Sequence, residues 1–257
     1  LLYFRNNGKL YIGGSFLEVE YVQDLDSFEA IDQGYSKDKY NIYYAGTPIY
    51  DVDKSTFQII MPDYYAKDKN NVYSGSDKIK DANPDTIKIL NQVYLKDDKN
   101  VFLNFGQKIE NADATTFEVM EENTSYGKDK NNVYIGNSSI GLWKLDKIEN
   151  PETFEFLSDT INTDSFYGKD KYNVYYVNRI FLSCFGTYTW IGFKVEGINK
   201  DKVKFLNKKF IKDDKNIYFE GKILEDVDYN TFEVLPNGDG KDKNRSYEYL
   251  TKDEWKW

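Results

Sequence analysis

The sequence predicts a mainly β repeat protein of about seven to eight units of ~30 residues, stacked as an open β-rich solenoid or superhelix. Three observations predict it: one motif that recurs at a period near 30 residues, a second motif in phase with it, and short aromatic-rich runs separated by turn residues. A unit of this size cannot bury an apolar face alone, whereas stacked neighbours can. A β-propeller-like ring is the alternative, although its blades usually take about 40–50 residues.

The first motif is Asp-Lys followed by Asn or Tyr, and it predicts a turn. Asp and Asn side chains bond to nearby backbone groups and therefore favour turns. Tyr64-Tyr65 before one copy and Val72-Tyr73 after it are typical of short strands. Successive lysines lie 30, 30, 31, 41, 44 and 28 residues apart in the copies Asp38-Lys39-Tyr40, Asp68-Lys69-Asn70, Asp98-Lys99-Asn100, Asp129-Lys130-Asn131, Asp170-Lys171-Tyr172, Asp214-Lys215-Asn216 and Asp242-Lys243-Asn244.

A tight hairpin is predicted after the second strand of each unit. Gly75-Ser76 marks it in one unit, because such turns need a positive φ, and Ile79 then lies on the return strand. The same place in other units reads Ala45-Gly46, Phe105-Gly106, Gly136-Asn137 and Glu220-Gly221.

The second motif, Asp/Asn-x-x-Thr/Ser-Phe, resembles the start of a helix. Asp and Asn are good N-caps, and Pro84 and Pro151 stand at the first helical position, where proline is best tolerated. Few residues separate the cap from the next strand, so a single helical turn of the 3₁₀ kind is expected, with the aromatic residue in the core. The copies are Asp24–Phe28, Asp53–Phe57, Asn83–Ile87, Asp113–Phe117, Asn150–Phe154 and Asp228–Phe232, with a worn version at Asn199–Val203.

Each unit is thus read as a short β-meander of about three strands plus one helical turn. No linker or composition break interrupts the chain, so residues 1–257 are expected to form a single continuous repeat domain. Residues 1–31 read as a degenerate first unit, and residues 244–257 as a C-terminal cap. The longer units lie within residues 131–215 and carry insertions.

Composition excludes several functional classes. The chain has no histidine and one cysteine, Cys184, so Ser-His-Asp catalysis, imidazole metal sites and an internal disulfide are excluded. A net charge of −9 argues against nucleic acid as a partner. No run of about 20 apolar residues is present, so no transmembrane segment is expected. The protein is therefore interpreted as a non-enzyme, without catalytic, cofactor-binding or metal-ligating residues.

The repeated residues have structural explanations. The Asp-Lys-Asn copies lack the spacing of a calcium loop, and neighbouring lysines compete for each carboxylate, so turn formation is preferred to metal binding. Repeated tyrosines either pack the core, with their hydroxyls reaching polar groups, or face outward to stack on sugars or a partner. We expect core packing for Tyr43, Tyr44, Tyr73, Tyr134, Tyr175, Tyr176 and Tyr218.

The repeats resemble those of the DKNYY family, bacterial proteins named after an Asp-Lys-Asn-Tyr-Tyr motif. The resemblance rests on Lys67-Asp68-Lys69-Asn70-Asn71-Val72-Tyr73 and Lys169-Asp170-Lys171-Tyr172-Asn173-Val174-Tyr175-Tyr176 and covers nearly the whole chain. It implies a bacterial source, often with a secretion or lipoprotein signal ahead of the repeats. Location is left open between the cytoplasm and export with the signal removed. The family offers no catalytic residues.

Residues that break the repeat are better candidates for function than those that all units share. One insertion surrounds residues 140–145, and a second covers residues 179–197. Within it, Ile180 to Phe193 are fourteen uncharged residues that read as a long hairpin. The hairpin is either extra core, an exposed binding patch or a membrane-dipping loop. The candidate partner-binding residues are Trp143, Arg179, Phe181, Phe185, Tyr188, Trp190 and Phe193.

The hypothesis that fits these observations is a protein-binding repeat scaffold. One variant is an acidic inhibitor or immunity-type protein whose charge steers it to a basic enzyme. A carbohydrate or cell-wall binding module, using exposed Tyr and Trp, is the alternative. The partner is expected to be another protein of unknown identity, with a glycan as the other option.

Overall fold

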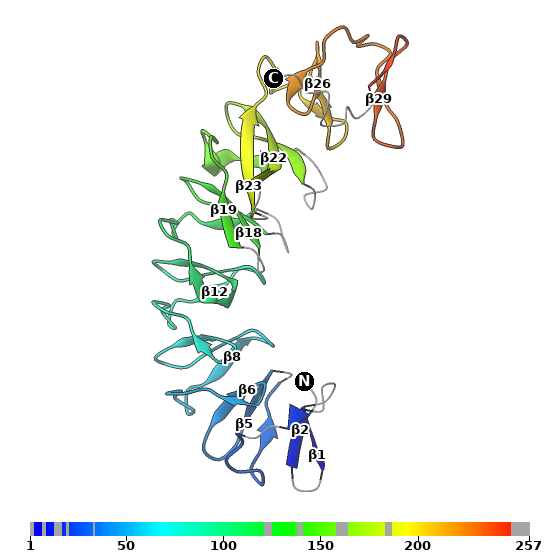
Figure 1. Cartoon of the computed structure of the whole chain (residues 1–257). Helices are drawn as coiled ribbons and strands as arrows, with labels where there is room; N and C mark the ends of the chain where they lie inside the picture. The colour runs from blue at the N-terminus through cyan, green and yellow to red at the C-terminus, as the bar shows by residue number, and fades with distance from the viewer. Residues whose placement is uncertain are drawn as a thin grey trace. The chain divides into compact units, whose positions relative to one another are not determined.

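The computed structural model describes residues 3–6, 9–12, 17–18, 21–32, 34–120, 125–137, 141–157, 164–182 and 187–247. The predicted C-terminal cap therefore falls mostly outside the described residues. The chain divides into two compact units. Unit 1 comprises residues 1–125 and 136–142, and unit 2 comprises residues 126–135 and 143–257. Both are built from small antiparallel sheets (Figure 1).

The sheets of unit 1 follow one another in chain order, and each is a meander whose neighbouring strands are hydrogen-bonded. The first has three strands and the next three have four. They are β1 (Tyr3–Asn6), β2 (Lys9–Ile12) and β3 (Leu17–Glu18); β4 (Glu29–Ala30), β5 (Tyr35–Lys37), β6 (Ile42–Tyr44) and β7 (Thr47–Pro48); β8 (Gln58–Met61), β9 (Tyr65–Lys67), β10 (Val72–Ser74) and β11 (Asp77–Lys78); and β12 (Lys88–Ile89), β13 (Tyr94–Lys96), β14 (Val101–Leu103) and β15 (Gln107–Lys108).

The sheets of unit 2 repeat the same order with one enlarged member. That sheet consists of β20 (Glu155–Phe156), β21 (Ser165–Lys169), β22 (Val174–Leu182) and β23 (Thr187–Lys194). Two further sheets follow: β24 (Lys204–Phe205), β25 (Phe210–Lys212), β26 (Ile217–Phe219) and β27 (Lys222–Ile223), then β28 (Glu233–Val234), β29 (Gly240–Lys241) and β30 (Ser246–Tyr247). The division between the units passes through β16 (Glu118–Val119), β17 (Tyr126–Lys128), β18 (Val133–Asn137) and β19 (Gly141–Lys144).

The predicted meander is confirmed, but six of the eight described sheets have four strands where three were expected. The additional strand is the run after the second motif, such as Gln58–Met61, which pairs with β9 in the same sheet. Two-residue hairpins occur where predicted, at Gly75-Ser76, Ala45-Gly46 and Glu220-Gly221. Gly136-Asn137 was predicted as such a turn, but it lies within β18 because that strand is longer than its counterparts.

The prediction of one helical turn in each unit is wrong. The second motif forms a hydrogen-bonded turn instead, as where Thr56 N–H bonds to the Asp53 carbonyl at 3.2 Å. Four residues between the cap and the strand are too few to repay helix nucleation. In the described part of the chain, the short 3₁₀ segment Pro151–Thr153 is the one copy of this motif that is helical. A proline at this position does not suffice, because Asn83-Pro84 forms the turn.

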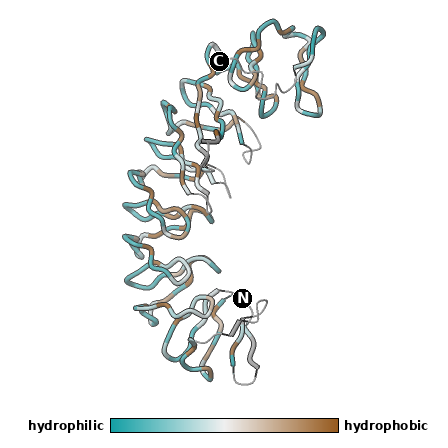
Figure 2. Tube along the Cα trace, in the orientation of Figure 1, coloured by the Kyte–Doolittle hydropathy of each residue, from teal (hydrophilic) through white to brown (hydrophobic). Residues whose placement is uncertain are grey.

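The core is formed by aromatic and β-branched side chains that point between consecutive sheets. Tyr35 and Ile42 of one sheet, with Ile49 directly after it, pack with Ala66 and Tyr73 of the next. Figure 2 shows hydrophilic turns along the edges and hydrophobic segments between them. The expected core tyrosines are buried, apart from the half-buried Tyr44. No helix in the described residues is long and apolar enough to cross a membrane.

Candidate functional site

Seven buried aspartates recur at the turn between the second and third strands. We call them the turn aspartates: Asp38, Asp68, Asp97, Asp129, Asp170, Asp213 and Asp242. In two units they are not the aspartates that precede lysine in the first motif. Asp97 and Asp213 are buried, while Asp98 and Asp214 beside them are exposed. The Asp-Lys-Asn alignment is therefore one residue out of register in those repeats. In every repeat, the buried aspartate is the one that lies five residues before the core aromatic residue.

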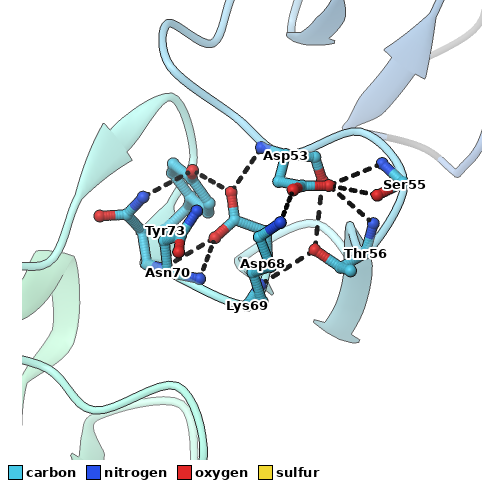
Figure 3. A network of polar contacts seen from close by, with 8 residues as sticks. Asp53, Ser55, Thr56, Asp68, Lys69, Asn70 and Tyr73 are labelled. Atoms are coloured by element: carbon cyan, nitrogen blue, oxygen red, sulfur yellow. Dashed lines mark hydrogen bonds and ion pairs between the residues drawn. The ribbon is translucent and has the colours of Figure 1, made fainter.

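The Asp68 carboxylate accepts four hydrogen bonds (Figure 3). One oxygen accepts the N–H groups of Asn70 and Asn71, each at 2.7 Å, and thereby forms the turn. The other oxygen accepts the Tyr73 hydroxyl at 2.8 Å and the Asp53 N–H at 2.7 Å. One carboxylate thus joins a turn, a core tyrosine and the preceding cap residue.

Hydrogen bonding determines the protonation of these carboxylates. Burial alone would raise the pKa of Asp68, but the N–H groups and the Tyr73 hydroxyl outweigh it and hold the pKa below its usual value. The same balance lowers the pKa of Asp38, Asp170 and Asp213. These groups are therefore charged acceptors, and they suit neither proton transfer nor a ligand that needs free oxygens.

The cap residues of the second motif hold the exposed lysine of the turn. Asp53 accepts N–H bonds from Ser55 at 3.0 Å and Thr56 at 3.2 Å. Its other oxygen lies 2.5 Å from the Lys69 ammonium, and the Thr56 hydroxyl accepts the Lys69 N–H at 3.0 Å (Figure 3). The Lys69 ammonium and the Ser55 hydroxyl hold the pKa of the Asp53 carboxyl well below its usual range. The second motif is therefore a docking point for the turn.

Further hydrogen bonds link neighbouring sheets at the strand ends that lie away from the turn aspartates. The Tyr35 hydroxyl donates to the carbonyls of Tyr64 and Gly75 in the next sheet. The Tyr167 hydroxyl donates to the Lys209 carbonyl at 2.9 Å and accepts the Gly221 N–H at 2.9 Å. The shared motif residues thus have structural roles. Among the described residues, no group of three acidic, Cys or His side chains is placed to hold a metal ion.

The predicted long hairpin is confirmed. Strands β22 and β23 pair antiparallel over eight residues each, from Tyr175↔Lys194 to Leu182↔Thr187. Paired residues share a face of the sheet, so Arg179 and Trp190 lie on one face, and Tyr176 and Phe193 lie on the other. The predicted partner-binding residues are therefore divided between two faces.

On the first face, Trp190 and Arg179 are engaged within the protein. The Trp190 side chain is only 7% exposed, and its ring packs against Phe166 at 5.8 Å. The half-exposed Arg179 guanidinium forms an ion pair with Asp164 at 2.7 Å. Phe181 is paired with Tyr188 in the register of the two strands. Phe185 lies outside the described residues, and Trp143 is a half-buried residue of β19.

On the second face, Phe193 is 43% exposed and borders a surface hollow of about 420 Å³. A parallel bridge between Asp146 and Ile191 holds the segment before the second motif against β23. We call this site the Phe193 hollow; its lining is Lys147, Ile148, Glu149, Gly192, Phe193, Lys194 and Glu196.

Charges and an aromatic ring combine at this hollow. The Lys147 ammonium lies 6.0 Å from the centre of the Phe193 ring. Lys194 forms an ion pair with Glu149, which also accepts the Asn173 amide at 2.9 Å. The Lys194 ammonium and the Asn173 amide lower the pKa of Glu149. Lys147, Glu149 and Lys194 were not predicted, since they look like ordinary surface charges until the bridge brings them together.

The fold and these sites define a tandem β-repeat protein in which a buried turn aspartate ties the cap, the turn and the core of a repeat together. The chain matches the DKNYY family over residues 3–60, 35–93 and 94–251, and it belongs to that family. No curated protein and no solved structure matches the chain.

Proposed function

We propose that the protein is a non-enzymatic scaffold that binds another protein through the Phe193 hollow. The observation that carries the proposal is the exposure of Phe193 on the inserted hairpin, next to a hollow lined by both signs of charge. Aromatic anchors surrounded by polar groups dominate the energetics of protein interfaces. In repeat proteins, insertions also lie on one face, which is often the binding face.

The test compares the wild type with a Phe193→Ser/Lys147→Ala variant. Each is tagged, cross-linked in lysate of the source cells and analysed for captured protein, and the captured protein is then purified and titrated by calorimetry. Phe105→Ser is the matched control, because Phe105 is also an exposed phenylalanine of a hairpin. The proposal expects direct binding by wild type and control, weakened at least about tenfold in the double variant. Equal binding by all three, or no protein bound, contradicts it.

The inhibitor or immunity-type role is a narrower form of the same proposal. A net charge of −9 would speed encounter with a basic enzyme. If the protein is an inhibitor of this kind, the captured partner is expected to be a basic enzyme whose activity falls on binding. If the wild type is instead retained on cell-wall glycan with no protein present, the carbohydrate-binding function replaces the scaffold.

We also propose that the repeats form an open solenoid rather than a closed ring. Repeats of about 30 residues support this arrangement, as do the hydroxyls of Tyr35 and Tyr167, each of which bonds to the next sheet in sequence. Small-angle X-ray scattering tests it: an elongated particle is expected, and a compact disc-like particle contradicts it.

A further inference from the structure

In the described part of the chain, the longest strand at the edge of a sheet is β23. It runs over Thr187–Lys194 and stands last in the order β20-β21-β22-β23 (Figure 1). An edge strand presents N–H and C=O groups that can pair with a strand of another chain. The residues used below, Thr187–Trp190, do not line the Phe193 hollow, so this site is independent of the proposed function.

Other edge strands carry the features by which proteins prevent such pairing. Strands β7, β11, β15 and β27, each the last strand of its sheet, are two residues long and contain a lysine or a proline. Strand β8, the first strand of its sheet, has a bulge between Ile59 and Met61. Short length, lysine, proline and bulges all hinder pairing between sheet edges. The first seven residues of β23 have none of these features.

The register of the long hairpin shows which peptide groups face the open edge. The Val195 N–H donates to the Val174 carbonyl at 2.8 Å, so the peptide groups of Val195 face β22. Along an antiparallel pair, successive residues point their peptide groups alternately toward the partner strand and away from it. Every second residue before Val195 therefore faces β22, and Tyr188 and Trp190 point their peptide groups outward.

Part of this edge already holds a parallel segment. The bridge between Asp146 and Ile191 joins the Asp146 peptide to the outward groups beside Ile191, which are the Trp190 carbonyl and the Gly192 N–H. The edge therefore accepts extended backbone. Among the described residues, no backbone partner exists for the Tyr188 N–H, the Tyr188 carbonyl or the Trp190 N–H.

We propose that β23 pairs antiparallel with β23 of a second copy of this chain, with the two-fold axis at Tyr188. Each Tyr188 N–H donates to the Tyr188 carbonyl of the other copy, and the bridge at Asp146 stays intact. Two copies of a chain with a net charge of −9 meet most readily where charge is absent, and Ile180 to Phe193 carry none. A strand that pairs here must be extended, uncharged and rich in β-branched or aromatic residues, and Thr187–Trp190 of a second copy meets all three conditions.

Sedimentation of the full chain over a range of concentrations measures the association, and hydrogen exchange locates it. The expected result is a dimer that forms as concentration rises. The amides of Tyr188 and Trp190 should exchange quickly in dilute samples and slowly in concentrated ones. A monomer at about 1 mM, a dimer that leaves both amides unprotected, or a Tyr188 amide already protected in the monomer overturns the proposal.

A proline variant removes the outward donor alone. Proline is tolerated on an edge strand where its nitrogen faces solvent, so Tyr188→Pro should be monomeric with an unchanged midpoint of thermal unfolding. Ile223→Pro is the matched control. Ile223 stands opposite Tyr218 as Pro48 stands opposite Tyr43, so this variant copies a proline that the protein already has. It should dimerise like the wild type, and a dimer of unchanged strength in Tyr188→Pro contradicts the proposed pairing.

Two charge variants test the two-fold axis without depending on proline. Tyr188→Lys and Tyr188→Glu each place two like charges opposite each other, so each variant alone should be monomeric. Mixing them should restore a dimer that is about tenfold or more stronger than either variant forms alone. If each variant dimerises alone, or the mixture stays monomeric, Tyr188 does not stand opposite its own copy and the proposal is wrong.

Discussion

At the scale of single residues, one carboxylate connects three parts of the chain. Asp68 orders its own turn, accepts a hydroxyl from the core and holds the N–H of a residue 15 positions earlier. Hydrogen bonds to a charged group contribute about 1.5–3 kcal/mol each. Loss of one partner is therefore measurable, and the repeats supply their own controls.

The tyrosine hydroxyl at this carboxylate can be tested in both directions. Tyr73 donates to Asp68, whereas Phe102 occupies the same position beside Asp97 without a hydroxyl. We expect Tyr73→Phe to lower the free energy of unfolding by about 1–2 kcal/mol and Phe102→Tyr to raise it by less. Urea unfolding followed by tyrosine fluorescence measures both. A stabilising effect of Tyr73→Phe would contradict this role of the hydroxyl.

In most repeats the exposed residue of the turn is matched to the cap residue; Asn150, with Lys171, is the exception. Asp53 pairs with Lys69, and Asp228 with Lys243, each at 2.5 Å. Where the cap is Asn83, Asp98 replaces the lysine and accepts the Asn83 amide at 3.2 Å. We expect Lys69→Asp to lower the urea midpoint by placing two carboxylates together, and Asp53→Asn/Lys69→Asp to recover most of the loss. Additive effects of the two substitutions would show that the residues are not coupled.

At the scale of elements, the hairpin turns fix how closely the sheets approach. Gly106 has φ +81°, and a Cβ there would lie 2.8 Å from Ile79 of the preceding sheet. Phe105 precedes it with a φ of 61°, which non-glycine residues rarely adopt. Glycine is thus required at this turn for two reasons: the positive φ of the backbone and the close contact with Ile79.

Two glycines separate these effects. Gly197 has φ +76°, but a Cβ added there would meet no atom within 4 Å, so Gly197→Ala introduces backbone strain alone. We expect it to cost about 1 kcal/mol and Gly106→Ala to cost about 2–3 kcal/mol, because the latter also displaces Ile79. Thermal unfolding of both variants measures the two losses of stability. Equal losses would show that the contact between Gly106 and Ile79 does not contribute.

Elements were predictable where the local chemistry is decisive. Gly75-Ser76 indicates a hairpin through its required φ, and the run from Ile180 to Phe193 indicates the long hairpin. The helical turns were mispredicted because capping residues serve short turns as well as helices. The Phe193 hollow was only partly predictable, since it needs Glu149 and Lys194, which lie 45 residues apart. Aligning the repeats on the aromatic five residues later, Phe102 or Tyr218, would have identified Asp97 and Asp213.

At the scale of the whole molecule, the turn aspartates make stability depend on pH in a defined direction. The folded state lowers the pKa of Asp38, Asp68, Asp170 and Asp213 below 3.8, so their contribution is present above that pH and is lost as the pH falls through the folded values. Burial raises the pKa of Tyr65, Tyr175 and Tyr218 to about 12, so their contribution is present below pH 10 and is lost as the pH rises towards 12.

The expected outcome is a stability plateau between about pH 4 and pH 10 with cooperative unfolding on both sides. Near-ultraviolet circular dichroism against pH measures it, because the core tyrosines lose their fixed environment on unfolding. Full retention of that signal at pH 2 would contradict the structural role of the charged carboxylates.

Damage to one turn should remain local. Asp68→Ala removes the acceptor for four hydrogen bonds, and we expect a loss of about 3 kcal/mol. In a repeat protein, each sheet depends mainly on its neighbours. Hydrogen exchange should therefore accelerate in β8–β10 and the adjoining sheets of unit 1, while β25 and β26 keep their protection. Uniform acceleration along the chain would indicate a single cooperative unit.

The bond from each cap residue to the turn aspartate that follows it also bears on how such a chain changes in evolution. It spans 14, 15 or 20 residues, and the enlarged unit keeps it despite its insertions. A block of sequence running from one cap to the next therefore carries both the donor and the acceptor of this bond. Duplicating or deleting such a block in frame leaves every remaining joint complete, so the number of repeats can change without the invention of any new contact.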